Sequence, residues 1–219
     1  MIPADAPGQP AYWRDACAAL AADPVMAQLI ARYPEAQLSS RGEPFVTLVR
    51  AIVGQQISTR AADAVWARLL AAVPQLSPEA LLAHAPDALR AVGLSARKVE
   101  YAHDLARHFA EGRIDPARFQ ALDDETLIAE LVAVRGIGRW TVEMMLIFRL
   151  GRPDVLPVDD LGIRKGAQVV DGTGAMPTPR ELATRGEAWG PYRSYASLYL
   201  WRIADAAAPQ ARPVPRSQE

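Results

Sequence analysis

The sequence has a single cysteine, three histidines and no run of eighteen apolar residues. One cysteine, Cys17, cannot form an internal disulfide or a cysteine-based metal or iron–sulfur site, and we expect it to be a small buried side chain. Without a long apolar run, we expect no membrane-spanning helix. The first ten residues lack a basic start and an apolar core, so we expect no signal peptide and a cytoplasmic location.

Positive charge is not in excess either. The 24 Lys and Arg residues against 25 Asp and Glu residues give a net charge of −1. Domains that bind nucleic acids usually carry a surplus of Lys and Arg. Composition alone therefore does not suggest such binding, and any grip on a polyanion would have to come from a local patch or from backbone amides.

Long alternating apolar and polar runs, which are typical of strands, are also missing, and the periodicity is helical almost throughout. Phe45, Leu48, Val49 and Ile52 recur at the spacing of one helical face, and Val65, Leu69 and Val73 repeat that spacing further along. Expected helix starts, with a capping side chain or a cap followed by proline, are Ser58, Ser77-Pro78, Asp123 and Thr178-Pro179. The pattern predicts an all-α protein of about ten short helices.

Two glycines flank one apolar residue between two expected helices, at Gly136-Ile137-Gly138. Glycine permits positive φ and a close approach of the backbone to a ligand, and Ile137 can pin the turn to the core. The start of the second helix would then present N–H groups to an anion such as a phosphate, with Arg135 and Arg139 adding positive charge. Taken alone, the Gly-x-Gly pattern favours an ordinary glycine-rich helix–helix turn.

Two adjacent carboxylates, Asp159 and Asp160, follow the second of these helices after a proline-punctuated apolar loop, where a further helix begins. An aspartate at a helix start is usually an N-cap, so one of the pair is expected to serve only that purpose. Glu143, on the intervening helix, is expected on the solvated face. The three histidines lie on ordinary helices and are not expected to bind a metal.

Four segments together resemble the helix–hairpin–helix DNA glycosylase superfamily, and within it the 3-methyladenine DNA glycosylase II branch. The resemblance covers roughly residues 45–205. The segments are Ala51-Ile52-Val53-Gly54-Gln55-Gln56-Ile57-Ser58, Gly93-Leu94-Ser95-Ala96-Arg97-Lys98, the hairpin through Asp160-Leu161-Gly162, and Tyr192-Arg193-Ser194-Tyr195-Ala196 through Trp201.

The resemblance implies a domain organisation. We expect a flexible N-terminus at 1–10, a glycosylase domain at 11–208 and a disordered tail at 209–219. The glycosylase domain would have two helical lobes, roughly 45–125 and 11–44 plus 126–208, with the catalytic cleft between them. A monomer is expected.

The resemblance also implies a chemistry. The family's catalytic residue is an Asp about twenty positions past the hairpin's Trp or Lys, which selects Asp160 after Trp140, with Asp159 as the fallback. Strand-cleaving branches carry a nucleophilic Lys where this chain has Trp140, so a monofunctional glycosylase is implied. Its substrate would be double-stranded DNA containing alkylated purines, removed during base excision repair. No cofactor and no catalytic metal are expected, although the family pattern allows a structural monovalent cation at the hairpin backbone.

The remaining roles follow from the same resemblance. Trp140, Trp201 and Met144 would form the base pocket, Gln56 with Ile57 beside it would be the wedge that fills the vacated base stack, and residues 135–139 would bind DNA phosphate. Two alternatives stay open: a glycosylase for other damaged bases, and a non-catalytic helix–hairpin–helix DNA-binding protein.

Overall fold

The computed structural model describes residues 10–38 and 42–207, and within these ranges it contains helices and no strand. The all-α prediction is confirmed; the described residues form twelve α-helices and two short 3-10 helices, slightly more than predicted. The chain divides into two compact units: residues 11–37 with 156–207, and residues 38–155. The predicted flexible N-terminus, apart from Pro10, and the predicted tail lie outside the described residues. None of the helices in the described ranges is long and apolar enough to cross a membrane.

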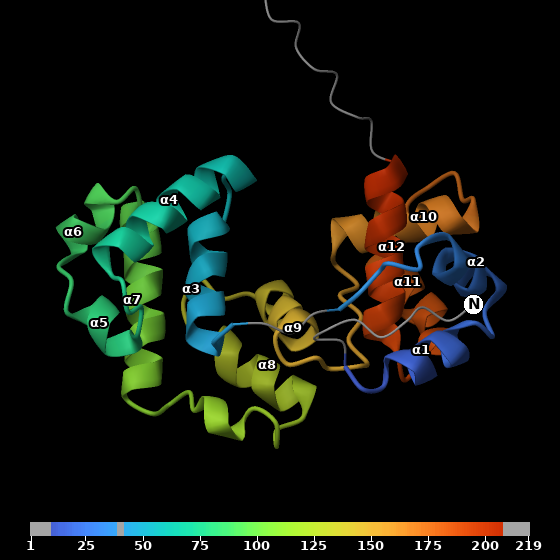
Figure 1. The fold of residues 1–219 in the computed structure, drawn as a ribbon, viewed down its shortest axis with the longest axis horizontal. Coiled ribbons are helices and arrows are strands. Elements are labelled where there is room, and N and C mark those ends of the chain that lie inside the picture. Colours follow the sequence, from blue (N-terminus) through green and yellow to red (C-terminus); the bar gives the residue numbers. More distant parts are fainter. Residues whose placement is uncertain (1–9, 39–41, 208–219) are drawn as a thin grey trace, which may run out of the picture. The chain divides into compact units, whose positions relative to one another are not determined.

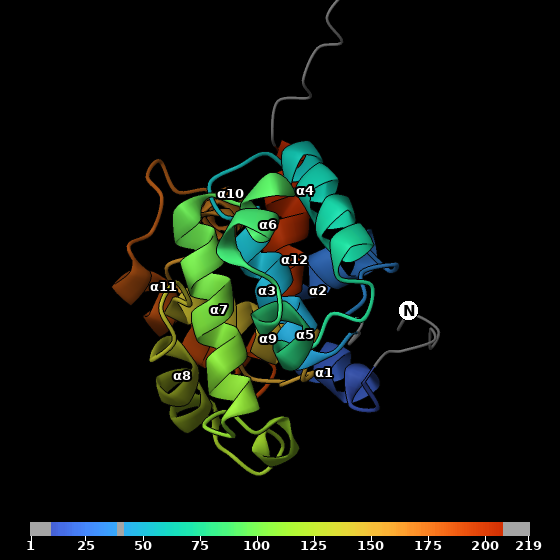
Figure 2. The same cartoon turned by 90° about the vertical axis from the view of Figure 1, so that its left-hand side faces the viewer.

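The larger unit is built around α3 and α7. Its helices are α3 (Pro44–Gly54), α4 (Thr59–Ala72), α5 (Pro78–Leu82), α6 (Pro86–Ala91), α7 (Ala96–Ala110), η1 (Pro116–Arg118), α8 (Asp124–Val132) and α9 (Arg139–Phe148). Figure 2 shows α5 and α6 beside α7. The predicted apolar face of α3 is fully buried, because it packs against α4, α7 and α9.

The smaller unit is centred on the crossing of α10 and α12. Its helices are α1 (Trp13–Leu20), α2 (Pro24–Arg32), α10 (Leu161–Asp171), α11 (Pro179–Arg185), η2 (Gly186–Trp189) and α12 (Arg193–Ala207). Figure 1 shows α10 crossing α12, and the close approach depends on Gly166. A Cβ at Gly166 would lie 2.1 Å from the carbonyl oxygen of Leu200, so only glycine fits there.

All of the predicted helix starts are confirmed. Ser58, Ser77, Asp123 and Thr178 are N-caps whose side chains accept a hydrogen bond from the first turn, and Thr178 forms a complete capping box with Glu181. Cys17 is buried as expected, and burial raises the pKa of its thiol even though the Tyr199 hydroxyl beside it acts in the opposite direction. A protonated, enclosed thiol is chemically inert.

The boundary between the units differs from the predicted one. Residues 42–44 and 126–155 group with 45–125, whereas the predicted lobes place them with 11–37. The reason lies in tertiary packing, since α8 packs on α9 and α9 packs on α3. The predicted cleft between the lobes stays a prediction.

Candidate functional site

The hairpin links α8 to α9 through residues 133–138. Ile137 is buried, as predicted, and Gly136 has a φ of +85°, which favours glycine. A Cβ at Gly136 would also lie 2.2 Å from the ring of Tyr101. Gly138 is the N-cap of α9 with a φ of −98°, and no side chain caps this helix end. A Cβ at Gly138 would meet nothing within 4 Å, so the backbone there is open to a ligand.

The two hairpin arginines are already engaged with carboxylates. Arg139 donates from Nε to Glu143 at 2.9 Å and from Nη1 to Glu125 at 2.9 Å, and these bonds raise the pKa of its guanidinium. Arg135 lies 3.9 Å from Asp104, and its backbone N–H donates to the same carboxylate at 3.0 Å. Neighbouring acids therefore offset the positive charge of both arginines, and their expected role in binding phosphate stays a prediction.

The expectation that Glu143 lies on the solvated face of its helix is wrong. It is only 5 % exposed, not on the solvated face, and its carboxylate holds Arg139 one helical turn earlier. The i, i+4 spacing of the two residues was visible in the sequence and is the signal that could have identified the pair. A charge buried in this way needs its partner, so Glu143 fixes the first turn of α9.

A pocket of about 670 Å³ opens between α3 and α9, within the larger unit. Its lining includes Thr47, Ala51, Gln55, Gln56, Trp140 and Met144, and none of the described residues that line it carries a charge. Trp140 is 50 % exposed, which is unusual for so large an apolar side chain. Two of the three predicted base-pocket residues, Trp140 and Met144, thus line one cavity, together with the predicted wedge residue Gln56 and its neighbour Gln55.

Trp201, the third predicted pocket residue, lies beside Asp160 in the smaller unit. Its indole Nε1 donates to Asp160 Oδ1 at 2.9 Å, and the same oxygen accepts the backbone N–H of Ile163 at 2.8 Å. Gly162 makes room for this arrangement, since a Cβ there would lie 2.9 Å from the Trp201 ring. Asp160 is therefore the N-cap of α10 and at the same time holds an aromatic ring in place.

The two adjacent aspartates differ in their surroundings. Asp160 is 9 % exposed, whereas Asp159 is exposed to solvent. A carboxylate acts more strongly on a nearby charge where solvent is largely excluded. The geometry therefore favours Asp160 as the chemically useful member of the pair.

The wedge candidates lie in the turn after α3. Gln56 and Ile57 are exposed, and Gln56 has a φ of +57°, the only positive φ of a non-glycine residue among residues 10–38 and 42–207. A left-handed conformation at such a residue is costly and is often retained for function. No group of three or more potential His, Cys, Asp or Glu metal ligands occurs in the described ranges.

An all-α chain with a glycine hairpin that opens a helix, and with a sheltered carboxylate at the start of the next, defines a helix–hairpin–helix protein of the kind that handles DNA. Residues 49–191 match the family described as HhH-GPD superfamily base excision DNA repair protein. The chain belongs to this superfamily.

Individual relatives narrow the comparison. DNA-3-methyladenine glycosylase 1 of Schizosaccharomyces pombe is 35 % identical over 187 residues, which cover 83 % of this chain and 82 % of that protein. The crystal structure of DNA-3-methyladenine glycosidase from Bacillus halodurans has a TM-score of 0.80 at 39 % identity, covering 85 % of this chain and 87 % of the other. The S. pombe 3-methyladenine DNA glycosylase in complex with abasic DNA has a TM-score of 0.77 at 32 % identity, covering 88 % and 98 %.

Proposed function

We propose that this protein is a monofunctional DNA glycosylase that hydrolyses the N-glycosidic bond of alkylated purines, such as 3-methyladenine and 7-methylguanine, in double-stranded DNA during base excision repair. The observation that carries the proposal is the sheltered Asp160 carboxylate, held by Trp201 and the N-terminus of α10. The names of the relatives, DNA-3-methyladenine glycosylases, support the choice of substrate.

The chemistry assigned to Asp160 is electrostatic. Cleavage of an N-glycosidic bond passes through an oxocarbenium-like transition state, in which positive charge develops on the sugar. A sheltered carboxylate stabilises that charge and orients the attacking water. Because an N-alkylated purine is already cationic, it leaves without strong acid assistance, which agrees with a described pocket lining that contains no histidine.

The pocket between α3 and α9 is assigned to the flipped base. A base inside a duplex is out of reach and has to be extruded, at a cost of a few kcal/mol that is smallest at a lesion. The indole of Trp140 attracts a cationic ring by roughly 0.5–2 kcal/mol, and more as water is excluded. Met144, one turn further along α9, adds a polarisable apolar wall. Gln56, with Ile57 beside it, is assigned to the vacated stack.

The hairpin is assigned to the DNA phosphates, through the backbone of Gly136, Ile137 and Gly138 and the start of α9. Helix N-termini bind anions because their first N–H groups point outward along the helix dipole. Such contacts carry no sequence information, which suits an enzyme that scans DNA. Arg135 and Arg139 act chiefly by holding the turn and the first turn of α9. A monovalent cation bound to the hairpin backbone would be structural.

Trp140 also bears on the reaction type. A tryptophan cannot form the Schiff base through which a lysine at this position would lead to strand cleavage. We therefore propose base removal that leaves an intact abasic strand. We place the reaction in the cytoplasm, and at the nucleoid if the host is bacterial. We propose that the active form is a monomer.

The test is release of free base from methylated duplex DNA by the purified protein, with wild type, Asp160→Asn and Asp159→Asn compared in parallel. Wild type and Asp159→Asn should release 3-methyladenine or 7-methylguanine, while Asp160→Asn should bind abasic DNA without releasing base. Borohydride should trap no covalent adduct. Release of neither methylated base by the wild type would overturn the proposal, and activity only on oxidised or mismatched bases would redirect it to another class of lesion.

A further inference from the structure

The turn that follows α3 holds a backbone conformation that its own sequence does not favour. Gln56 adopts the left-handed region, with φ +57°, although it is not a glycine. A residue keeps such a conformation only where its surroundings hold it. Gln55, the C-cap of α3, comes immediately before it and is half-buried.

Two side-chain hydrogen bonds connect the residues just before Gln56 to distant segments of the chain. Lys98, in the first turn of α7, donates from Nζ to the carbonyl oxygen of Val53 at 2.8 Å, and burial lowers the pKa of this ammonium group. Gln55 donates from Nε2 to the carbonyl oxygen of Gly136 at 2.8 Å. The second bond joins the turn carrying Gln56 directly to the hairpin, across 81 positions of sequence.

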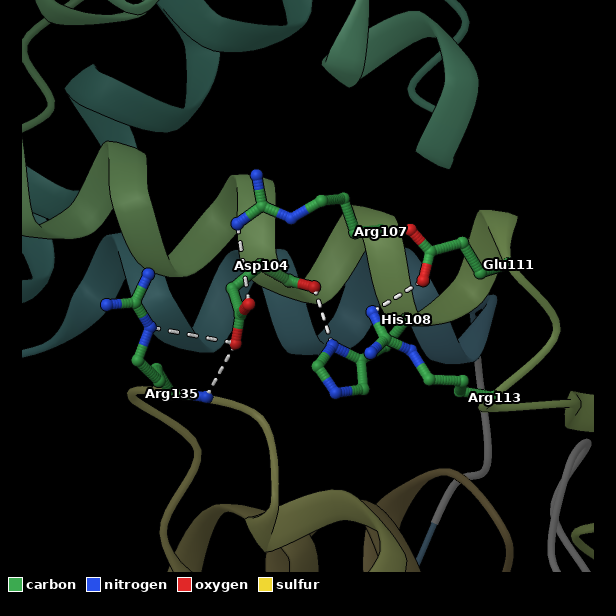
Figure 3. A network of polar contacts seen from close by, with 6 residues as sticks. All are labelled: Asp104, Arg107, His108, Glu111, Arg113 and Arg135. Atoms are coloured by element: carbon green, nitrogen blue, oxygen red, sulfur yellow. Dashed lines mark hydrogen bonds and ion pairs between the residues drawn. The ribbon is translucent and has the colours of Figure 1, made fainter.

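The hairpin is itself fixed to α7. Figure 3 shows Asp104 on α7 receiving the backbone N–H of Arg135, at 3.0 Å, with the Arg107 guanidinium on its other side. Burial alone would raise the pKa of Asp104, but these donors outweigh it and hold the carboxyl ionised. Tyr101, one turn earlier on α7, lies against Gly136 where a Cβ would not fit. The hairpin therefore cannot shift without disturbing the Gln55 contact.

We propose that Gln55 is a positioning residue that couples the Gln56 turn to the phosphate-binding hairpin, so that seating a phosphate on the hairpin and inserting Gln56 into the base stack occur as one rigid step. This inference rests on the proposed function. Its physical basis is that a misplacement of about 1 Å in such a constellation can cost roughly a hundredfold in rate. If the Gln56 turn were mobile before DNA bound, ordering it would reduce the free energy gained on binding.

The test uses Gln55→Met, which keeps the length of the side chain and removes its N–H donor. The matched control is Gln168→Met, because Gln168 on α10 also donates its amide to a carbonyl oxygen, that of Gly174, at 3.4 Å. Three quantities are measured on the full-length protein: affinity for abasic duplex, the single-turnover rate of base release, and the fluorescence of 2-aminopurine placed beside a lesion, which reports unstacking.

Gln55→Met should lower the single-turnover rate of base release by about ten- to a hundredfold and the amplitude of unstacking by about twofold. Its affinity for abasic duplex should stay within about threefold of wild type. Gln168→Met should match wild type in all three. In a Gln56→Ala background, Gln55→Met should add almost nothing, because residues that act as a unit are non-additive. Gln55→Glu, which turns a carboxylate toward the Gly136 carbonyl, should reproduce the defect and serves as the second variant if Gln55→Met does not fold.

Fully additive effects of the Gln55 and Gln56 substitutions would overturn the coupling. Normal unstacking with a rate loss that varies from lesion to lesion would also overturn it, because Gln55 would then be contacting the base. Failure of the proposed function is separate: it would appear as an absence of base release by the wild type, whereas abasic-DNA affinity and unstacking in the five variants would still report on the coupling.

Discussion

Two substitutions of Asp160 separate its role in stability from its role in catalysis. The carboxylate Oδ1 accepts two hydrogen bonds, from the backbone of Ile163 and from the indole of Trp201. Asp160→Asn retains an amide oxygen that can accept both bonds and removes only the negative charge. Asp160→Ala removes the charge and the oxygen that accepts both bonds.

The two variants should therefore differ in stability. Loss of an N-cap costs about 1 kcal/mol, and a sheltered indole N–H left without its acceptor costs roughly 1–3 kcal/mol more. Asp160→Ala should lower the free energy of unfolding by about 2–4 kcal/mol. For a chain of this length that corresponds to a drop in Tm of roughly 4–16 °C, at about 2–4 °C for each kcal/mol. Asp160→Asn should stay within about 1 kcal/mol of wild type.

Unlike their stabilities, the base-release activities of the two variants should be reduced to a similar extent. Removing a group that stabilises transition-state charge in a sheltered site costs about a hundred- to a thousandfold in rate, so both variants should lose base release to that extent at a temperature where both are folded. The assay is single-turnover release from methylated duplex, alongside thermal melting. Base release by Asp160→Asn within about fivefold of wild type would refute the electrostatic role, and a melting temperature of Asp160→Ala equal to that of wild type would refute the capping argument.

Three further predictions test individual backbone positions. Gln56→Gly should raise the free energy of unfolding above that of Gln56→Ala, by roughly 1 kcal/mol in denaturant titration, because glycine tolerates the left-handed φ, while both variants lose unstacking activity. Gly138→Ala should leave Tm unchanged and weaken binding to abasic duplex, whereas Gly136→Ala should lower Tm, because its Cβ would meet the Tyr101 ring; equal affinities for Gly138→Ala and wild type would argue against the backbone grip. Gly166→Ala should destabilise the α10–α12 crossing by several kcal/mol, measured by thermal melting, since its Cβ would meet the backbone of Leu200.

Features set by neighbouring residues could be predicted from the sequence. The capping side chains of Ser58, Ser77, Asp123 and Thr178 act within one turn of their own position, so a short stretch of sequence specifies them. The buried face of α3 follows from its apolar spacing in the same way. At the site, the glycine hairpin and the aspartate at the start of α10 are local motifs too.

Features set by tertiary packing could not be predicted. The assignment of residues 126–155 depends on α9 packing against α3, about ninety positions earlier in the chain. The sequence around Gln56 gives no sign of its left-handed φ, nor of the long-range hydrogen bonds that Lys98 makes to Val53 and Gln55 makes to the hairpin just before it. The sequence does not point to Asp104 as a residue that holds the hairpin, because its hydrogen bond to the Arg135 backbone spans 31 positions.

The proposed backbone grip on phosphate accounts for DNA binding by a chain with a net charge of −1. Arg135 and Arg139 face three carboxylates, those of Asp104, Glu125 and Glu143, so the local charge of these groups is not positive. Attraction by free guanidinium groups would be strong far from the surface and steeply dependent on salt. N–H groups at the start of α9 act only at hydrogen-bond distance and need a fixed backbone. The ion pairs supply that fixed backbone, so in the proposed phosphate grip the acids that weaken long-range attraction also position the N–H groups that act at short range.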